Sequence, residues 1–356
     1  MNGVGGLKRR RSPSGLLELA GPALLLVLLA LLGSLASTSI ELEFRSALVS
    51  ATIVVALYVF IGNSGVVSFG HMSFVAVGAF AAGLVTVPEA LKLSVSPELY
   101  PFIASAEVGN AASLAIAAVV GGVYAFLVGV PLMRLSGLAA GIATFAVLEI
   151  THNVIRNWPK IGPGAKTLPL VPETSGLLQV TIGALAAVAI AFAYQRSRSG
   201  RLLRAAREDP AAAQGSGVNI HRQRLVAFTL SGALAGFAGG LLVHLLGSIT
   251  TEQVYLDLTF VTLAMLIIGG VASLWGAVVG ALLVSGLNSF LAEAEKGIRD
   301  VDLPTGTRLV TLGALMALVL IFRPAGIVSR APLPGIPTRL SRQLASLRRF
   351  ARQKAS

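Results

Sequence analysis

Long apolar stretches follow one another along almost the whole chain, separated by short polar segments. Continuous apolar runs are typical of transmembrane α-helices, which need about 20 residues to cross the hydrocarbon core of a bilayer. The strands of a membrane β-barrel instead alternate polar and apolar residues over about ten positions. The pattern therefore predicts an all-α polytopic membrane protein. We expect about ten transmembrane segments, at Leu16–Leu35, Leu48–Ile61, Phe74–Val87, Ala111–Met133, Leu138–Val154, Leu177–Tyr194, Leu225–Leu246, Leu258–Ile268, Leu274–Phe290 and Leu309–Ile321.

Two glycine-rich blocks interrupt this apolar pattern, one in each half of the chain. Residues 62–71 read GNSGVVSFGH, and residues 269–276 read GGVASLWG. At membrane depth, irregular backbone is tolerated where protein buries it or where it lines a cavity, and discontinuous helices often carry a transporter's substrate site. Close helix packing through small residues uses the same composition. The first interpretation predicts broken or re-entrant helices at both blocks, and Leu258–Ile268 is too short to span the membrane alone. It also predicts a translocation pathway that includes Asn63, Ser68, Gly70, His71, Glu149, Gly269, Gly270 and Trp275.

Composition supports the membrane class and argues against an enzyme. Only 12% of the residues are charged and 54% are hydrophobic, whereas a soluble domain carries about 25% charged residues. The absence of cysteine excludes disulfides, thiolate catalysis and cysteine metal sites. No HxH or HExxH spacing suggests a metal site, and no Ser-His-Asp set or paired carboxylates stand at useful spacing. We therefore predict no metal, no cofactor and no catalytic residues in this chain.

The net charge of +12 is explained by its location rather than by a nucleic-acid partner. Basic residues gather before the first apolar run, between the sixth and seventh, and after the last. Because basic loops stay on the cytoplasmic side, a ten-segment arrangement places all three there and both termini in the cytoplasm. The expected organisation is a basic cytoplasmic N-terminus over residues 1–14, a transmembrane domain over residues 15–327 with a cytoplasmic loop at 195–224, and a basic cytoplasmic tail over residues 328–356.

Each end of the chain leaves an alternative. A signal peptide would end near Leu35, but the apolar core from Leu16 to Leu32 is longer than the usual length of about 7–15 residues, which favours an uncleaved first span. In the tail, apolar residues at helical spacing among arginines suit an amphipathic helix on an anionic membrane surface. A solvated basic tail explains the same residues. The apolar positions of that tail are Leu340, Leu344, Leu347 and Phe350.

The loop Ser199–Asn219, SGRLLRAAREDPAAAQGSGVN, is unusually basic for an interior segment. We expect a helix over Leu202–Gln214, with Pro210 in a first turn or at a kink and Gly217 beyond its end. An ordinary positive-inside loop would need only the arginines, whereas the alanine run and the terminating glycines favour a helix that docks on a soluble partner. The residues expected to serve this contact are Arg201, Arg204, Arg207, Glu208, Asp209, Ala212, Ala213 and Gly217.

We single out three titratable residues in or next to the apolar segments: Glu149, His71 and His244. Ionisable groups are costly there and are often functional, so Glu149 is a candidate for the translocation path or for a proton relay. The alternative is a packing carboxylate that is hydrogen-bonded to Asn153 or to a neighbouring helix. For His71 and His244 we expect structural hydrogen bonds.

Taken together, these motifs resemble the permease subunits of branched-chain amino-acid ABC importers, the LivH and LivM family, and the longer LivM type more closely. Residues 62–78 are similar to the family's G-x-x-G-x-x-S-x-G-H block, and residues 200–219 to its G-R-x-L-R-A-x-R-E loop. Residues 269–276 resemble its G-G-x-G-S-L-W-G block, with Ala272 in place of the third glycine, and residues 322–326 its closing F-R-P-x-G.

The resemblance implies an inner-membrane permease that has no ATPase activity, with ATP and Mg²⁺ held by partner subunits. The expected partners are two ABC ATPase subunits docked on the loop, a second permease subunit in a heterodimer, a periplasmic or extracellular substrate-binding protein, and membrane lipid. Ala212, Ala213 and Gly217 correspond to the EAA-type coupling loop, in which Ala211 replaces the glutamate. Uptake of urea, short amides or a sugar is the alternative within this class. An ion-coupled secondary carrier with Glu149 as proton site is the alternative outside it.

Overall fold

The computed structural model describes residues 14–295, 306–323 and 325–328, and within them the chain is almost entirely helical. An isolated antiparallel bridge joins Leu168 and Ile249. The predictions for the basic N-terminus before residue 14 and for the tail beyond residue 328, including its amphipathic helix, lie outside the described residues. The elements are α1 Ser14–Ser34, α2 Thr38–Ser64, α3 His71–Thr86, α4 Glu89–Val95, α5 Pro101–Ala104, α6 Asn110–Leu132, α7 Gly137–Asn157, α8 Leu177–Arg196, α9 Arg198–Glu208, α10 Pro210–Gly215, α11 Ile220–Leu246, η1 Glu252–Val254, α12 Leu256–Gly269, α13 Leu274–Glu295 and α14 Thr307–Phe322.

The helices confirm an all-α polytopic membrane protein. Among the described residues, seven helical stretches are long and apolar enough to cross a membrane: α2, α6, α7, α8, α11, η1 with α12, and α13. Three shorter apolar helices cover Glu18–Ser34, His71–Thr86 and Val310–Val319. The predicted segment Leu258–Ile268 lies within a longer candidate span, Glu252–Gly269 of 18 residues, which consists of the 3₁₀ turn η1, Tyr255 and α12.

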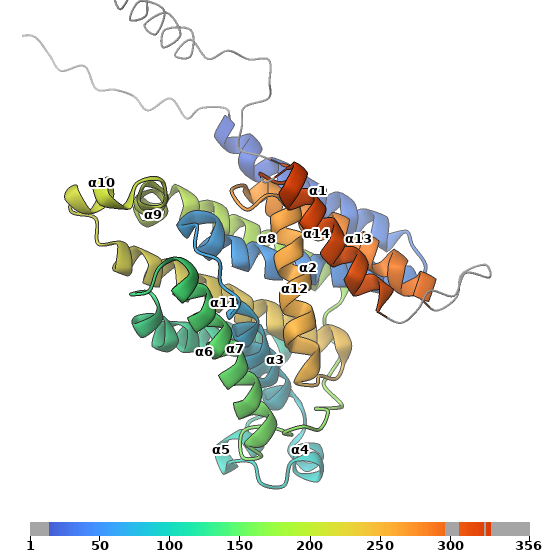
Figure 1. The fold of residues 1–356 in the computed structure, drawn as a ribbon. Coiled ribbons are helices and arrows are strands. Elements are labelled where there is room, and N and C mark those ends of the chain that lie inside the picture. Colours follow the sequence, from blue (N-terminus) through green and yellow to red (C-terminus); the bar gives the residue numbers. More distant parts are fainter. Residues whose placement is uncertain (1–13, 296–305, 324, 329–356) are drawn as a thin grey trace, which may run out of the picture.

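Helix α2 lies at the centre of the packing. It contacts α1, α8, α9, α11, α12 and α13, and every residue from Ala47 to Ser64 except Ser50 is buried. Its sequence contains no charge after Arg45 and is rich in Val, Leu, Ile and Ala. A helix that is apolar all round is suited to a position surrounded by other helices. Figure 1 shows α2 running through the middle of the bundle.

Helices α3, α6 and α11 approach one another closely through small residues. A Cβ atom at Gly78 of α3 would lie 2.2 Å from the carbonyl oxygen of Gly236 in α11, and one at Gly236 would lie 2.3 Å from the carbonyl oxygen of Ala117 in α6. Small side chains let helix backbones meet, which is how helices associate in a lipid environment that offers no hydrophobic driving force.

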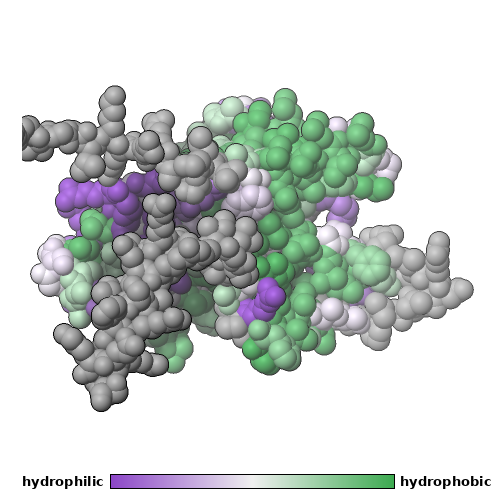
Figure 2. Space-filling view, turned by 90° about the horizontal axis from the view of Figure 1, so that it is seen from above, coloured by the Kyte–Doolittle hydropathy of each residue, from purple (hydrophilic) through white to green (hydrophobic). Residues whose placement is uncertain are grey.

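Short helices cover the two ends of the bundle. Helices α9 and α10 lie at one end and α4 and α5 at another (Figure 1). The space-filling view shows apolar surface over the middle of the molecule and hydrophilic surface at the end that carries α9 and α10 (Figure 2). In the α4–α5 segment the Lys92 ammonium is buried and donates to the carbonyl oxygens of Ile103 and Ala106. Burial lowers the pKa of Lys92, while Glu107 and Glu89 oppose that shift.

Candidate functional site

The basic loop folds as two short helices rather than as the single helix expected over Leu202–Gln214. Helix α9 ends at Glu208, and Asp209 then caps α10 by accepting a hydrogen bond from the Ala212 amide at 2.9 Å. Pro210 occupies the first turn of α10, where its missing N–H costs no hydrogen bond. The break at Asp209 therefore follows from one residue that ends a helix and caps the next.

The two helices present a polar outer face and an apolar inner one. Ala206, Ala213 and Ile220 form a small apolar cluster that holds the loop against α11. Five of the eight predicted docking residues are exposed: Arg201, Glu208, Asp209, Ala212 and Gly217. Gly217 has a φ of 79°, a left-handed conformation that glycine adopts without strain. The exposed set lies on one compact segment that is accessible to a partner.

Arg204 and Arg207 point toward the protein instead. Arg204 donates from Nη2 to the carbonyl oxygen of Gln195, at the end of α8. Arg207 donates from Nη1 to the carbonyl oxygen of Gly62, in the last turn of α2, at 2.7 Å. The last carbonyls of a helix have no intrahelical partner, so Arg207 satisfies a group that α2 itself leaves open. The loop is thereby bonded to the central helix of the bundle.

The two glycine-rich blocks meet beside this contact. A Cβ atom at Gly62 would lie 2.8 Å from the carbonyl oxygen of Val271, which belongs to the break between α12 and α13. The segment after α14 joins the same place, because the Val328 amide donates to the carbonyl oxygen of Gly269 at 2.9 Å. Gly270 has a φ of 122°, which L side chains rarely adopt. The structure thus brings the break that contains Gly269 and Gly270 to Gly62, whose carbonyl oxygen accepts from Arg207.

The remaining residues of the first block form a buried network. His71 is 1% exposed, and its Nδ1 and Nε2 lie 2.8 Å from the hydroxyls of Ser68 and Ser231. A Cβ atom at Gly70 would lie 2.5 Å from the carbonyl oxygen of Thr144. Asn63 Nδ2 donates to the carbonyl oxygen of Val59 at 2.9 Å. These groups are tightly packed, which agrees with the structural role expected of His71.

Three other predicted residues lie apart from that network. Glu149 accepts a hydrogen bond from Asn153 Nδ2 at 2.6 Å and another from the Tyr255 hydroxyl, so the expected packing contact with Asn153 is present. His244 lies 2.9 Å from the Ser113 hydroxyl and 3.0 Å from the carbonyl oxygen of Pro172, as expected of a structural histidine. The ring of Trp275 packs directly against Gly21 of α1.

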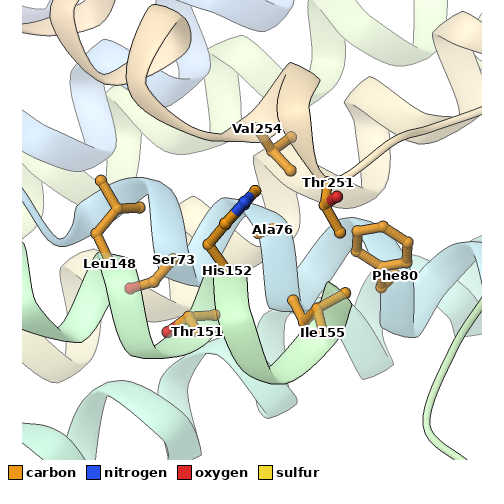
Figure 3. A pocket seen from close by; sticks show the side chains of 9 residues that line it. All are labelled: Ser73, Ala76, Phe80, Leu148, Thr151, His152, Ile155, Thr251 and Val254. Atoms are coloured by element: carbon orange, nitrogen blue, oxygen red, sulfur yellow. The ribbon is translucent and has the colours of Figure 1, made fainter. Parts of the chain in front are cut away.

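A small cavity lies between α7 and α3, and Leu148, Thr151 and His152 of α7 line it. In Figure 3, His152 of α7 points toward the segment that carries Thr251 and Val254, with Ser73 and Phe80 of α3 beside it. The cavity measures about 10 Å³, which is room for at most one water molecule. It is too small to hold a transported molecule.

A second, larger cavity, which the sequence did not predict, lies beside the first part of α2, away from the Arg207 contact at Gly62. It measures about 430 Å³ and lies between α2, α11, α12 and α13, with η1 at its edge. Its polar lining comes from residues that are isolated in the sequence, among them Glu43, Ser50, Asp257, Ser285 and Asn288. No motif marks these positions, and only the packing of the four helices brings them together.

Comparison with known proteins decides the family. Residues 39–320 match the family described as branched-chain amino acid transport system / permease component. The chain belongs to this family. It is therefore a multi-pass transport protein rather than an enzyme, and the resemblance seen in its motifs is confirmed.

Individual relatives of this permease are distant. The high-affinity branched-chain amino acid transport system permease protein LivM of Escherichia coli K12 is 25% identical over 306 residues, covering 76% of this chain and 66% of LivM. LivH of the same organism is 33% identical over 147 residues, covering 41% of this chain and 44% of LivH. A probable ABC transporter permease protein, YphD of E. coli K12, is 28% identical over 179 residues, covering 46% of this chain and 51% of YphD. No solved structure matches the chain.

Proposed function

We propose that this permease is the membrane-spanning subunit of an ATP-driven ABC importer that moves branched-chain or related amino acids into the cytoplasm. Membership of the permease family supports the class, and the relatives named LivM and LivH support the substrate. The observation that carries the proposal is the hydrogen bond from Arg207 to the Gly62 carbonyl. It joins an exposed basic segment, suited to a soluble partner, to the helix around which the membrane domain packs.

In this proposal the chain binds no nucleotide, and two ABC ATPase subunits hold ATP and Mg²⁺. Helices α9 and α10 act as the coupling segment, through Arg201, Arg204, Arg207 and the exposed residues up to Gly217. Movement of the docked ATPase pulls α9, and Arg207 passes that displacement to α2 and to the two glycine-rich breaks. The energy for the change between outward- and inward-facing states comes from ATP binding outside this chain, since a ligand shifts an equilibrium only by its differential affinity.

The proposed setting is the bacterial inner membrane. Ten helices cross it, namely the seven long stretches and the three shorter apolar helices, so that both termini lie in the cytoplasm. A second permease subunit and membrane lipid surround the bundle, and a periplasmic or extracellular binding protein delivers substrate at the end opposite α9 and α10. The proposed pathway is formed by Asn63, Ser68, Gly70, His71, Glu149, Gly269, Gly270 and Trp275. Gly269 and Gly270 precede Val271, whose carbonyl oxygen lies close to Gly62.

The test is uptake into proteoliposomes that contain the complete complex, with labelled leucine, urea and glucose supplied in parallel. We expect leucine uptake that requires both ATP and the ATPase subunits. Uptake of urea or glucose in place of leucine would correct the substrate. Uptake by this chain without any ATPase subunit, abolished by Glu149→Gln, would replace the proposal with an ion-coupled carrier.

A cross-link tests the docking surface directly. Because the chain contains no cysteine, an Ala212→Cys variant carries a single thiol on the exposed face of α10. We expect this thiol to cross-link to an ATPase subunit that carries a cysteine in its docking cleft. Ser94→Cys, exposed on α4, is the matched control and should not cross-link. Equal cross-linking at both positions would contradict docking at α9 and α10.

A further inference from the structure

The larger cavity has no role in the coupling contact. Its residue Glu43 precedes Gly62 by 19 positions on α2, which corresponds to about 28 Å at 1.5 Å per residue. It extends along α2 from Glu43 to Ile53, or about 15 Å. Beyond Ile53, α2 is buried on all sides as far as Ser64. The cavity is therefore open at the end of the bundle away from α9 and α10, and closed toward them.

The depth of this cavity contains polar groups without partners. Ser285 is 8% exposed, and its hydroxyl has no hydrogen-bond partner among the described residues. The side-chain oxygen of Asn288, one turn further along α13, is also buried and has none. Ser50 is the one residue not buried between Ala47 and Ser64 of α2, and it also lines the cavity. Buried polar groups normally find partners, so the Ser285 hydroxyl and the Asn288 oxygen are available to hydrogen-bond a molecule inside the cavity.

The mouth of the cavity is acidic. Glu43, Glu252 and Asp257 line it, and among the described residues no lysine or arginine lines the cavity. Glu252 lies 3.0 Å from Arg156 Nη1, which offsets its charge, whereas Glu43 accepts a hydrogen bond from the neutral Ser289 hydroxyl. Like charges that line a cleft focus the potential there. A cationic group is therefore attracted to the mouth, and an anion is repelled.

The opposite wall of the cavity is apolar. Ile53, Val261 and Met265 form it, on α2 and α12. A volume of about 430 Å³ lies within the range of small-molecule sites, about 300–1,000 Å³. The cavity thus offers carboxylates at its mouth, hydroxyl and amide groups deeper in, and an aliphatic surface beside them.

We propose that this cavity is the outward-facing substrate site of the permease, and that it takes a zwitterionic amino acid with an apolar side chain. The substrate's ammonium lies near Glu43 and Asp257 and donates to the Asn288 side-chain oxygen. Its carboxylate accepts from the hydroxyls of Ser50 and Ser285, and its aliphatic side chain lies against the apolar wall. The assignment rests on the proposed function, because it takes the substrate to be an amino acid. It adds residues that no motif of the chain marks.

The first experiment measures the charge selectivity of the cavity. Ser285→Cys places the chain's only thiol at its depth, in the complete complex reconstituted in lipid nanodiscs. We expect a cationic methanethiosulfonate reagent to modify it about tenfold faster than an anionic one of the same size, because the acidic mouth concentrates cations. The ratio should fall toward one when Glu43→Gln and Asp257→Asn are added. Equal rates in the single variant, or no reaction with either reagent, would overturn the assignment.

The second experiment tests the substrate class on the same thiol. Leucine at saturating concentration should slow modification at least about tenfold by occupying the site, as expected when more than nine sites in ten are filled. Glutamate and glucose should not slow it. Protection by glutamate or glucose equal to that by leucine would refute an amino-acid site with an acidic mouth and an apolar wall. Ser94→Cys, exposed on α4 and outside the cavity, should react at the same rate with and without leucine.

Two features keep the result interpretable. If Ser285→Cys does not assemble, Asn288→Cys provides a thiol one helical turn closer to the mouth, with the same expected order of rates. Labelling requires no ATP, so an importer that fails to couple still reports on the cavity. Loss of ATP-dependent uptake with retained leucine protection would reject the proposed coupling alone, whereas ATP-dependent leucine uptake without protection would reject this site alone.

Discussion

The contact between Arg207 and the end of α2 leads to a sharp prediction about energy coupling. In Arg207→Ala the guanidinium that donates to the Gly62 carbonyl is lost. Its stem is lost as well, and that stem packs so closely that a Cβ atom at Gly65 would lie 2.9 Å from Arg207 Cγ. The buried carbonyl at the end of α2 is then left without its donor. We expect ATP hydrolysis to continue while uptake falls.

The free energy lost in Arg207→Ala has two contributions. Leaving a buried carbonyl unsatisfied costs about 1–3 kcal/mol, and a cation at a helix C-terminus contributes about 0.3–1 kcal/mol through the helix dipole. A loss of about 2–3 kcal/mol corresponds to roughly a 30- to 150-fold change in an equilibrium between coupled and uncoupled arrangements. Arg207→Lys keeps the charge but not the planar fork of donors, so its loss of coupling should lie between that of the unchanged protein and that of Arg207→Ala.

The assay is the ratio of leucine transported to ATP hydrolysed by the complete complex in proteoliposomes. Arg198→Ala is the matched control, since Arg198 is an exposed arginine of the same helix outside the coupling set. The ratio should fall at least about tenfold in Arg207→Ala and stay unchanged in the control. Equal ratios in the two variants, with both complexes intact, would refute the idea that this hydrogen bond transmits the movement of α9.

Three further predictions concern stability and local structure. Gly78→Leu should destabilise the bundle by about 1–3 kcal/mol or more, because its Cβ would lie 2.2 Å from a carbonyl oxygen of α11. Thermal unfolding in detergent measures the effect, and Gly286→Ala is the control, since no atom lies within 4 Å of a Cβ there. Lys92→Met should leave two carbonyl oxygens unpaired and speed limited proteolysis between α4 and α6. An unchanged cleavage rate would show that the ammonium does not hold this segment in place. Asp209→Ala should remove the cap of α10 at a cost of about 1 kcal/mol, visible as faster amide hydrogen exchange at Ala212, whereas Asp209→Asn should retain protection.

The helical elements could be predicted from sequence because their signal is local. Each apolar run between polar segments became a helix, and Pro210 took the first-turn position that its ring geometry favours. The contact of Glu149 with Asn153 was also predictable, since residues four apart share one face of a helix. In these cases the residues that decide the structure lie within one or two turns of each other.

The rest depends on which helices become neighbours. Asp209 ends one helix and caps the next, and the pattern of apolar positions does not reveal that choice. The 3₁₀ turn η1 resembles a polar loop in the sequence, yet it precedes α12 directly and lengthens the candidate span to Glu252–Gly269. The polar cavity is further from prediction, because Ser50 and Ser285 are ordinary small residues in apolar helices until α2 and α13 pack side by side.

The position of α2 suggests why one helix serves both proposed sites. The cavity borders its first half, at Ser50 and Ile53, and Arg207 binds its last turn, at Gly62. Between them α2 has no proline or glycine, and kinks in helices arise mainly at such residues, at π-bulges or at inserted polar groups. A displacement applied at Gly62 therefore moves the cavity wall as a rigid unit rather than being absorbed on the way. The glycine-rich breaks stand just beyond the driven end, where the backbone must change direction. In the proposed mechanism the glycine-rich breaks lie outside this rigid segment, and ATP-driven movement of α9 reaches the cavity wall at Ser50, about 18 Å along α2 from Gly62.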